Sequence, residues 1–394
     1  MSRTGSILTL NAGSSSVKFA LFDTARDLHQ SVRGEIENLS SVPHFHAVDD
    51  QGRVLIERRW KKADNASYPH VIEELLAFAE SHLGDGGLAA VGHRIVHGGA
   101  DYSGPVKLTP KVIDALETLT PLDPSHLPLN IAPIRAVAAA RPKLPQIACF
   151  DTAFHHTMPK VAHTYAIPRA LTEQGVRAYG FHGLSYEYIA GQLKDLAPDL
   201  AGGRVIVAHL GAGASLCALL HGRSIATTMG FSTLDGLMMA TRCGIIDPGA
   251  LLYLGRQGQS FDQIEEMLYR KSGLLGVSGI SGDVRELLAS DKPAAREALD
   301  LFAYRLAWEI GALTSALGGL DGLVFTAGIG EHSAEIRADV CTRLGWLGLR
   351  LDPWANKAHA GIISQSDSAV AVRVIPTNEE AMIAHHTRAL LHKA

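Results

Sequence analysis

Cysteine is scarce in this chain, and long apolar runs are missing. The four cysteines form no CxxC pair, which argues against a disulfide framework and against a thiolate zinc site. No stretch approaches the roughly 20 apolar residues of a membrane span. The start, MSRTGSILTLNAG, lacks the apolar core and cleavage site of a signal peptide. We therefore expect a cytoplasmic protein with reduced thiols and no membrane partner.

Concentrated positive charge is absent as well. The 36 Lys and Arg residues are balanced by 40 Asp and Glu residues, the net charge is −4, and no basic block occurs. Binding to nucleic acid therefore has no electrostatic support. The patterns GxxxxGK[ST], GxGxxG and HExxH are also missing, which disfavours a P-loop enzyme, a Rossmann dehydrogenase and a zinc hydrolase.

What the chain does contain is glycine and mixed secondary structure. It has 394 residues, 46% of them hydrophobic, which suggests two or three domains with sizeable cores. Its 39 glycines permit tight turns and close backbone approach, as phosphate sites require. Strand and helix patterns alternate throughout, which predicts an α/β fold.

One strand–turn–strand pattern occurs twice. Residues 8–22 (LTLNAGSSSVKFALF) and 206–220 (IVAHLGAGASLCALL) each run from an apolar strand through a Gly/Ser/Ala turn into a second apolar strand. Residues 323–339 (LVFTAGIGEHSAEIRAD) read as a strand, a Gly-rich turn and the start of a helix. Small side chains let backbone N–H groups face an anion. The pattern predicts two halves that close on a polyphosphate.

Local patterns predict several elements. Strands are expected at 54–58 and 91–96, and residues 147–150 read as an apolar segment that places Asp151 at a strand's carboxyl end. Helices are expected at 68–83, from Pro110 with Thr109 as N-cap, from Ser260 to a stop at Gly273, from Pro293 toward Gly318, and at 378–393.

Polar residues cluster around these turns. Asn11 offers a neutral oxygen to a metal or its water, and Lys18 supplies a compact positive charge. Arg94 lies in the last part of a predicted strand and is suited to bind a carboxylate with two parallel hydrogen bonds. His182 and Arg242 each stand next to or near glycine. The plain structural alternatives, a hairpin turn or a buried histidine, remain open for each of these residues taken singly.

Nine segments together resemble the acetate kinase family, in family order from residue 8 to about residue 384: LNAGSSSVKF, VGHRIVHGG, FDTAFHHTMP, YGFHGLS, HLGAGASLCAL, GFSTLDGLMMATRCG, SGLLGVSGISGDVREL, FTAGIGEHSAEIR and IPTNEEAMIA. The resemblance implies two duplicated ribonuclease-H-like (actin-like ATPase) domains around a central nucleotide cleft. We expect the first at 1–151, with the helix at 381–394 packing back on it, and the second at 152–380.

The resemblance also implies the activity. Members transfer the γ-phosphoryl group of ATP reversibly to acetate, giving acetyl phosphate and ADP. They use Mg²⁺, with Mn²⁺ as a substitute, and are typically homodimers. Because acetate is an anion at neutral pH, the reaction needs charge neutralisation and positioning rather than a general base. Asp151 is then expected to orient Arg94 or a metal-bound water rather than carry a proton.

Site residues are carried over position by position. Catalytic roles are implied for Arg94, His126, Asp151, His182 and Arg242. Contacts with the acid are implied for Arg94, Val96, Ser125, Phe181 and Thr233. The implied magnesium residues are Asn11 and Glu379. The implied ATP-binding residues are Ser14, Ser16, Lys18, His209, Leu210, Gly211, Ala212, Gly213, Asp283, Val284, Arg285, Gly328, Ile329, Gly330, Glu331 and His332.

The chain departs from the family strings at several positions. Ala212 replaces an asparagine in the phosphate turn, and Leu184 and Tyr186 replace residues of the string FHGTSH beside His182. Ser125 and Thr233 replace a leucine and a proline that form the acetate methyl pocket in the family. Smaller or more polar side chains in the wall of this pocket predict some activity on propionate. A hydrophobic pocket distinguishes two acids that differ by one methylene by only about 1–3 kcal/mol.

Three other interpretations stay open. The first is a kinase for propionate or butyrate, which only Ser125 and Thr233 favour. The second is a chaperone-like or filament-forming ATPase of the acetate and sugar kinase, heat-shock chaperone and actin superfamily, to which the acetate kinase family belongs. Such an ATPase would not need Arg94, His126, His182 and Arg242. The third is a relative that binds nucleotide without catalysis, which the change at Ala212 invites.

Overall fold

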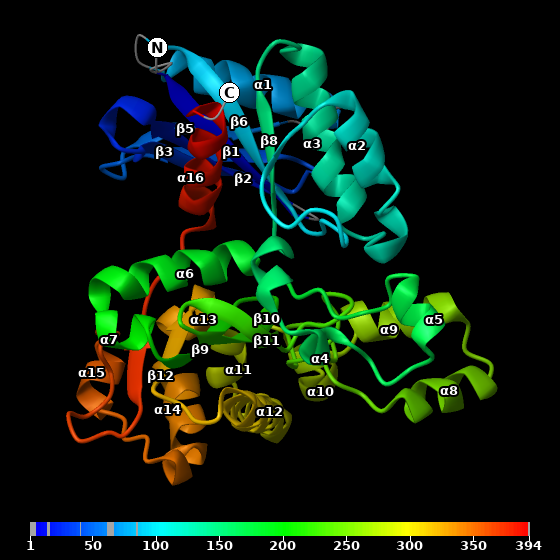
Figure 1. The fold of residues 1–394 in the computed structure, drawn as a ribbon, viewed down its shortest axis with the longest axis vertical. Coiled ribbons are helices and arrows are strands. Elements are labelled where there is room, and N and C mark those ends of the chain that lie inside the picture. The colour runs from blue at the N-terminus through cyan, green and yellow to red at the C-terminus, as the bar shows by residue number, and fades with distance from the viewer. Residues whose placement is uncertain (1–4, 14–15, 40, 61–66, 84–85, 393–394) are drawn as a thin grey trace. The chain divides into compact units, whose positions relative to one another are not determined.

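A computed structural model describes residues 5–13, 16–39, 41–60, 67–83 and 86–392. The chain forms two compact units (Figure 1): residues 1–154 with 378–394 make the first, and residues 155–377 make the second. None of the helices described in it combines the length and the apolar character needed to cross a membrane.

The first unit is built on an eight-stranded sheet of order β5-β4-β3-β2-β1-β6-β8-β7. Its strands are β1 (Ser6–Ala12), β2 (Val17–Asp23), β3 (His29–Glu37), β4 (His44–Asp49), β5 (Val54–Arg59), β6 (Leu88–Ile95), β7 (Val106–Lys107) and β8 (Gln146–Phe150). Its α-helices are α1 (Tyr68–Ser81), α2 (Pro110–Glu117), α3 (Leu127–Ala140) and α16 (Glu379–His392). The last helix, red in Figure 1, packs against β1 and β6.

The second unit is built on a five-stranded sheet of order β11-β10-β9-β12-β13. Its strands are β9 (Arg204–Leu210), β10 (Ala214–Leu220), β11 (Arg223–Thr227), β12 (Gly322–Thr326) and β13 (Ala371–Val374). Its α-helices are α4 (Lys160–His163), α5 (Arg169–Glu173), α6 (Gly183–Leu196), α7 (Pro198–Ala201), α8 (Pro248–Arg256), α9 (Phe261–Arg270), α10 (Gly273–Ser278), α11 (Val284–Leu288), α12 (Pro293–Leu317), α13 (Ala327–His332), α14 (Ala334–Arg343) and α15 (Pro353–Lys357).

The two sheets share one topology. The order β3-β2-β1-β6-β8 in the first unit matches β11-β10-β9-β12-β13 in the second. In both, the first three strands are antiparallel and the last two run parallel to the central strand. The predicted fold class, α/β with duplicated ribonuclease-H-like domains, is confirmed. Parallel neighbours bring their carboxyl ends to one edge of each sheet.

The two hairpins are not identical, although their sequences align. In the first, Ala12 pairs with Val17, which leaves four residues, 13–16, in the turn. In the second, Leu210 pairs with Ala214, which leaves the three residues 211–213. Consequently Asn11 lies opposite Lys18, whereas His209 lies opposite Ser215. The two segments therefore share the predicted strand–turn–strand pattern, but their turns differ in length by one residue, so an ungapped alignment does not match the opposite residues.

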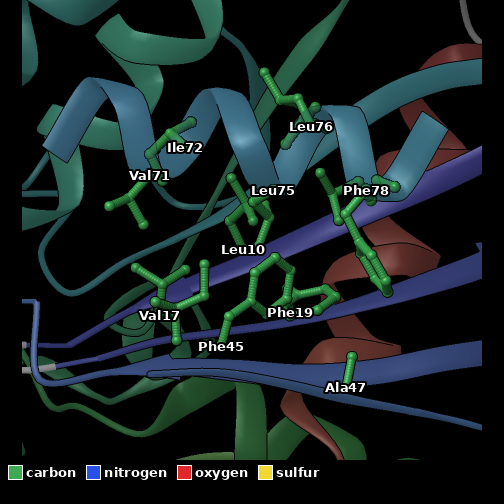
Figure 2. Packing of buried hydrophobic residues seen from close by; sticks show 14 of the residues in the cluster. Leu10, Val17, Phe19, Phe45, Ala47, Val71, Ile72, Leu75, Leu76 and Phe78 are labelled. Atoms are coloured by element: carbon green, nitrogen blue, oxygen red, sulfur yellow. The ribbon is translucent and has the colours of Figure 1, made fainter. Parts of the chain in front are cut away.

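The core of the first unit lies between α1 and the sheet. Val71, Ile72, Leu75, Leu76 and Ala79 are buried on one face of α1, as the sequence predicts. Figure 2 shows side chains of α1 pointing at the strands, where the aromatic rings meet edge to face. The ring centroids of Phe19 and Phe45 are 5.6 Å apart, and those of Phe45 and Phe78 are 5.1 Å apart. Such pairs add about 0.5–1.5 kcal/mol beyond the area they bury.

Most local helix patterns are confirmed. Thr109 caps α2, Ser260 and Gln263 form a capping box at α9, and Gly318 ends α12 in the left-handed conformation, with φ of 70°. The stop predicted at Gly273 is wrong, because α9 ends at Arg270 and Gly273 begins α10. At Gly273 a side chain would meet the backbone oxygen of Met239 at 2.2 Å, so close packing explains that glycine.

Gly34 tests this packing. It lies opposite Phe19 in the sheet, and a methyl group there would come within 2.5 Å of the Phe19 ring and of the His46 carbonyl oxygen. We expect Gly34→Ala to destabilise the first unit by about 1–3 kcal/mol, seen as a lower thermal midpoint. Gly191→Ala is the control, since this exposed glycine inside α6 has no atom within 4 Å. It should raise stability by up to about 1 kcal/mol; equal shifts in both variants would contradict the packing argument.

Candidate active site

The centre of the first unit's site is an arginine–aspartate pair. Arg94 is the penultimate residue of β6 and Asp151 directly follows β8, so the parallel pairing of these strands brings both to one edge. The Arg94 Nε donates to both carboxylate oxygens of Asp151, at 3.1 and 3.0 Å, and its Nη2 donates to Oδ2. Asp151 is completely buried, and its N–H donates to the Ile95 carbonyl at 3.0 Å. The pair fixes the guanidinium in one orientation.

Side chains with acceptor oxygens gather beside this arginine. The Arg94 Nη1 donates to Oδ1 of Asn11 at 3.1 Å. The amide of Asn11 donates in turn to Glu379 Oε2 at 3.1 Å and to Glu380 Oε1 at 3.3 Å. Both glutamates open α16, which packs on β1, where Asn11 lies. The structure thus brings Asn11, Arg94, Asp151 and Glu379 together and adds Glu380, which sequence reasoning missed although it adjoins Glu379.

The charges of this set influence one another. Burial raises the pKa of Asp151 to about 6, the Glu379 charge adds to the rise, and Arg94 opposes it. Burial acts to lower the pKa of Arg94, because it disfavours the charged form. The negative charges of Asp151 and Glu379 have the larger effect, so the pKa of Arg94 lies above its ordinary value. Burial and the neighbouring Glu379 charge also raise the pKa of Glu380. Three carboxylates therefore surround one arginine, and the set carries an excess of negative charge.

The first hairpin lies next to this set. Lys18 is exposed on β2 opposite Asn11, and its charge acts to lower the pKa of Glu380. The Gly13 N–H donates to the carbonyl of Ser16 at 2.8 Å within the turn. Ser14 lies outside the described residues.

His126 belongs to a separate cluster before α3. Its Nδ1 lies 2.9 Å from Oδ1 of Asp123, and its N–H donates to the same oxygen at 3.2 Å. The hydroxyl of Ser125 donates to this oxygen as well, at 3.0 Å. Asp123 is nearly buried, and its anchoring role was missed, although it lies only three residues before His126. Val96 is buried, with its N–H donating to Oδ1 of Asn130 at 2.8 Å.

In the second unit, the backbone before α6 presents His182. Gly180 has φ of 83°, and a side chain there would come within 2.5 Å of the His155 ring, so only glycine fits. His155 is buried between the Phe181 carbonyl and the Ser224 hydroxyl, and burial lowers its pKa to about 4. Phe181 is therefore held in the core, and His182 follows with φ of 57°, uncommon for a non-glycine residue.

His182 converges with Arg242 on the second hairpin. Its Nδ1 lies 2.8 Å from the Ser215 hydroxyl, and its ring stacks on that of His209 with centroids 4.1 Å apart. A Cβ built on Gly213 would lie 3.2 Å from Arg242 Nη2 and 3.5 Å from His182 Nε2. The side chains of His182 and Arg242 thus approach one point on the turn. Arg242 also donates to the Thr233 carbonyl at 2.6 Å, which fixes its guanidinium.

A pocket of about 900 Å³ lies beside the same turn, within the size range of small-molecule sites. Its lining joins all three segments expected to bind ATP in the second unit. The lining residues are Gly211, Ala212, Ala240, Gly282, Asp283, Val284, Arg285, Leu288, Ala289, Gly328, Ile329, His332, Ser333 and Glu335. Of the ATP-binding residues expected there, His209, Leu210, Gly213, Gly330 and Glu331 do not line it.

The contacts of Leu210, Gly330 and Glu331 are structural. Leu210 is fully buried in β9. The Glu331 carboxylate accepts from the N–H of Ala327 at 2.8 Å and of Thr377 at 3.2 Å. The carbonyl of Gly330 accepts from the fully buried Arg337 at 2.8 Å. The stretch expected as a Gly-rich turn is itself the short helix α13, which begins directly after β12 at Ala327, a residue with φ of 63°.

The repeated five-strand order and the pocket at the second hairpin define a member of the acetate and sugar kinase, heat-shock chaperone and actin superfamily. Residues 6–385 match the model of the acetokinase family. The acetate kinase of Rhodopseudomonas palustris (strain ATCC BAA-98 / CGA009) is 54% identical over 96% of this chain and 97% of its own length. The chain belongs to the acetokinase family.

Solved structures agree with this assignment. A propionate kinase from Francisella tularensis superposes with a TM-score of 0.89 at 38% identity, covering 97% of this chain and 98% of its own. An acetate kinase from Porphyromonas gingivalis superposes with a TM-score of 0.86 at 36% identity, covering 98% of this chain and 99% of its own. The resemblance stated from nine sequence segments is confirmed.

Asp151 should give stability a distinct pH dependence. An unfolded aspartate titrates near about 4, whereas burial raises the pKa of Asp151 to about 6 in the folded state. The folded state therefore holds this proton more tightly, and the group's contribution to stability is lost as the pH rises from about 4 through 6. We expect the thermal midpoint of Asp151→Asn, relative to wild type, to improve between pH 4.5 and pH 7.5. A constant difference would contradict the raised pKa.

Proposed function

We propose that the chain catalyses the reversible transfer of the γ-phosphoryl group between ATP and acetate, giving acetyl phosphate and ADP. The observation that carries this proposal is Arg94, whose Nε and Nη groups are fixed by Asp151 and Asn11 at a polar sheet edge. A preoriented guanidinium is suited to a carboxylate, which it recognises by parallel hydrogen bonds. Membership of the acetokinase family and the names of the close relatives support the same activity.

The second unit supplies the nucleotide site in this proposal. The pocket of about 900 Å³ is large enough for a nucleoside, and its lining is rich in glycine and small apolar side chains. Its turn at 211–213 places Gly213 next to Arg242 and His182. We infer that the adenosine occupies the pocket and that its phosphates extend toward these two side chains. Ala212 removes a side chain amide from the turn but leaves the backbone N–H groups.

The chemistry follows from charge. A carboxylate oxygen of acetate forms a bond to the γ-phosphorus while the bond from that phosphorus to the bridging oxygen breaks, so ADP leaves and no proton moves. Two anions must approach each other, and in this proposal Arg94 offsets the charge of the carboxylate and Arg242 offsets the charge of the phosphates, to which His182 donates a hydrogen bond. Asp151 orients Arg94 in this scheme, because both of its carboxylate oxygens already accept from that side chain.

Mg²⁺ fits the residues beside Arg94. The possible metal ligands there are the amide oxygen of Asn11 and the carboxylates of Glu379 and Glu380, and hard oxygen ligands suit this ion. Their excess negative charge also favours a divalent cation. Mg²⁺ is commonly held by one or two carboxylates together with substrate phosphates, which it neutralises when bound. We propose Asn11 and Glu379 as the holding residues, with Glu380 as an additional one.

A second candidate substrate is propionate. A propionate kinase is among the similar structures, and Ser125 and Thr233 stand where the family has leucine and proline. Ser125 is exposed and bonded to Asp123, so its side chain fills less apolar space than leucine would. We propose acetate as the main substrate and propionate as a weaker one.

The test mixes purified protein, Mg·ATP and hydroxylamine with acetate, propionate or butyrate, and measures acyl-hydroxamate over a range of acid concentrations. We expect turnover on acetate, with kcat/KM for propionate within a hundredfold of it, and a lower propionate-to-acetate ratio in Ser125→Leu, since one methylene is worth about 1–3 kcal/mol.

Each other outcome has a defined meaning. A preference for propionate or butyrate would rename the substrate. Absence of hydroxamate with every acid, despite ATP binding, would reject the proposed function and direct attention to Ala212. A propionate ratio below about a hundredth that Ser125→Leu leaves unchanged would reject the role of Ser125.

We further propose that the protein is a homodimer, as is typical of the family. Exposed apolar side chains on α8 and α9 support this, namely Leu252, Tyr253 and Phe261. Light scattering after gel filtration should give about twice the 42.0 kDa chain mass. Phe261→Glu should shift the mass toward the monomer, because a buried unpaired charge is unfavourable. Val161→Glu serves as the control, since Val161 on α4 is also strongly exposed. A monomeric wild type would reject the proposal.

A further inference from the structure

A chain of three polar groups ends on His182. The imidazole Nδ1 lies 2.8 Å from the hydroxyl of Ser215, and that hydroxyl is also bonded to the hydroxyl of Tyr186. Ser215 and Tyr186 are both completely buried, so these bonds are shielded from water. Tyr186 lies one helical turn after His182 in α6, and Ser215 lies near the start of β10. The chain joins the helix to the second hairpin.

The other imidazole nitrogen faces the phosphate turn. Nε2 of His182 lies 3.5 Å from the position that a Cβ on Gly213 would take, and Arg242 Nη2 lies 3.2 Å from the same position. Since Nδ1 is bonded to Ser215, Nε2 is the nitrogen directed toward Gly213 and Arg242. A phosphoryl oxygen held at this turn would therefore meet Nε2, which assists only if it carries a proton.

The proton location then depends on hydrogen-bond direction. A neutral imidazole has one donor nitrogen and one acceptor nitrogen. For Nε2 to donate, Nδ1 must accept the proton of the Ser215 hydroxyl, and the Ser215 oxygen can then accept from Tyr186. A phenol keeps its proton at neutral pH, so Tyr186 can act as the first donor of the chain.

We propose that Tyr186 and Ser215 are positioning residues that place the proton of neutral His182 on Nε2, the nitrogen that donates to the transferred phosphoryl group. The role rests on the proposed function above. Tyr186 is one of the positions at which this chain departs from the string FHGTSH, so the inference concerns a feature of this protein itself.

Other contacts hold the ring plane independently of Tyr186. The imidazole stacks on His209 with an interplanar angle of 17°. The Nδ1 of His209 is bonded to the Ser185 hydroxyl at 2.8 Å, and Ser185 is bonded to the Thr377 hydroxyl at 2.8 Å. Because this stack remains when the Tyr186 hydroxyl is removed, the ring should stay in place while its preferred tautomer changes.

The experiment compares wild type with Tyr186→Phe. In ¹⁵N-histidine NMR of the full chain, with the His182 signals assigned by their loss in His182→Gln, we expect the proton on Nε2 in wild type. In Tyr186→Phe the Ser215 oxygen becomes available as an acceptor, so the population protonated on Nδ1 should rise. The value of kcat should fall about 10- to 100-fold while KM for acetate stays within about twofold, as expected when an interaction made only in the transition state is lost.

Tyr179→Phe is the matched control. It removes the hydroxyl of another buried tyrosine, which donates to the Gly175 carbonyl at 2.7 Å. This variant should keep both the tautomer and kcat, even if it unfolds at a lower temperature. A His182 proton on Nδ1 in wild type would overturn the proposal, as would an unchanged tautomer and kcat in Tyr186→Phe. Should wild type phosphorylate no acid at all, the proposed function fails, whereas the NMR result still decides the role of Tyr186.

Discussion

The contact between Arg94 and Asp151 is the constraint on which the first unit's site depends. A fully buried carboxylate is unfavourable unless a charge and hydrogen bonds compensate it, and here one guanidinium supplies both. The parallel pairing of β6 and β8 delivers the two side chains to one edge, so the sheet itself sets their geometry. Asn11 and Glu379 are then arranged around an arginine that is already fixed. An anion that binds this arginine would find its donors oriented beforehand, which lowers the entropy lost on binding.

In the second unit, neutral groups hold the corresponding side chain, His182, in place. His182 takes a left-handed backbone conformation, and a ring stack and a hydroxyl chain hold it there. Asn11 and His209 occupy the penultimate positions of β1 and β9, the first strands of two sheets with the same order. The duplicated strand therefore supplies a polar side chain in each unit, one among carboxylates and one against a second imidazole. The common topology explains the positions, and the surrounding side chains explain the different chemistry.

Features with a local physical cause were predictable from the sequence. The apolar stripe of α1, the capping box of Ser260 and the glycine stop of α12 each depend on neighbours within a few residues, and each prediction was confirmed. Contacts across the fold were not predictable. Gly273 has a positive φ that fits a helix stop, yet α10 begins there, and the space that excludes a side chain is set by the distant Met239 carbonyl. Glu380 joins Asn11 across 369 residues, and Asp123 anchors His126 by a side chain bond that no spacing rule identifies. The strands β3 and β4 were missed because residues such as Gly34 weaken their strand pattern.

The unequal hairpins have a consequence for the history of the two halves. Opposite residues of an antiparallel pair point to the same face of the sheet, so Lys18 and Ser215 occupy equivalent places, although an ungapped alignment sets Ser215 against Val17. In the first unit the residue opposite the polar end of the central strand is the exposed Lys18, whereas in the second it is the buried Ser215. The change from a solvent-facing cation to an internal hydroxyl is thus a difference of side chain at equivalent places. The two copies have become non-interchangeable through their side chains, and a chimera that exchanged only their turns would keep Ala12 opposite Val17 and Leu210 opposite Ala214.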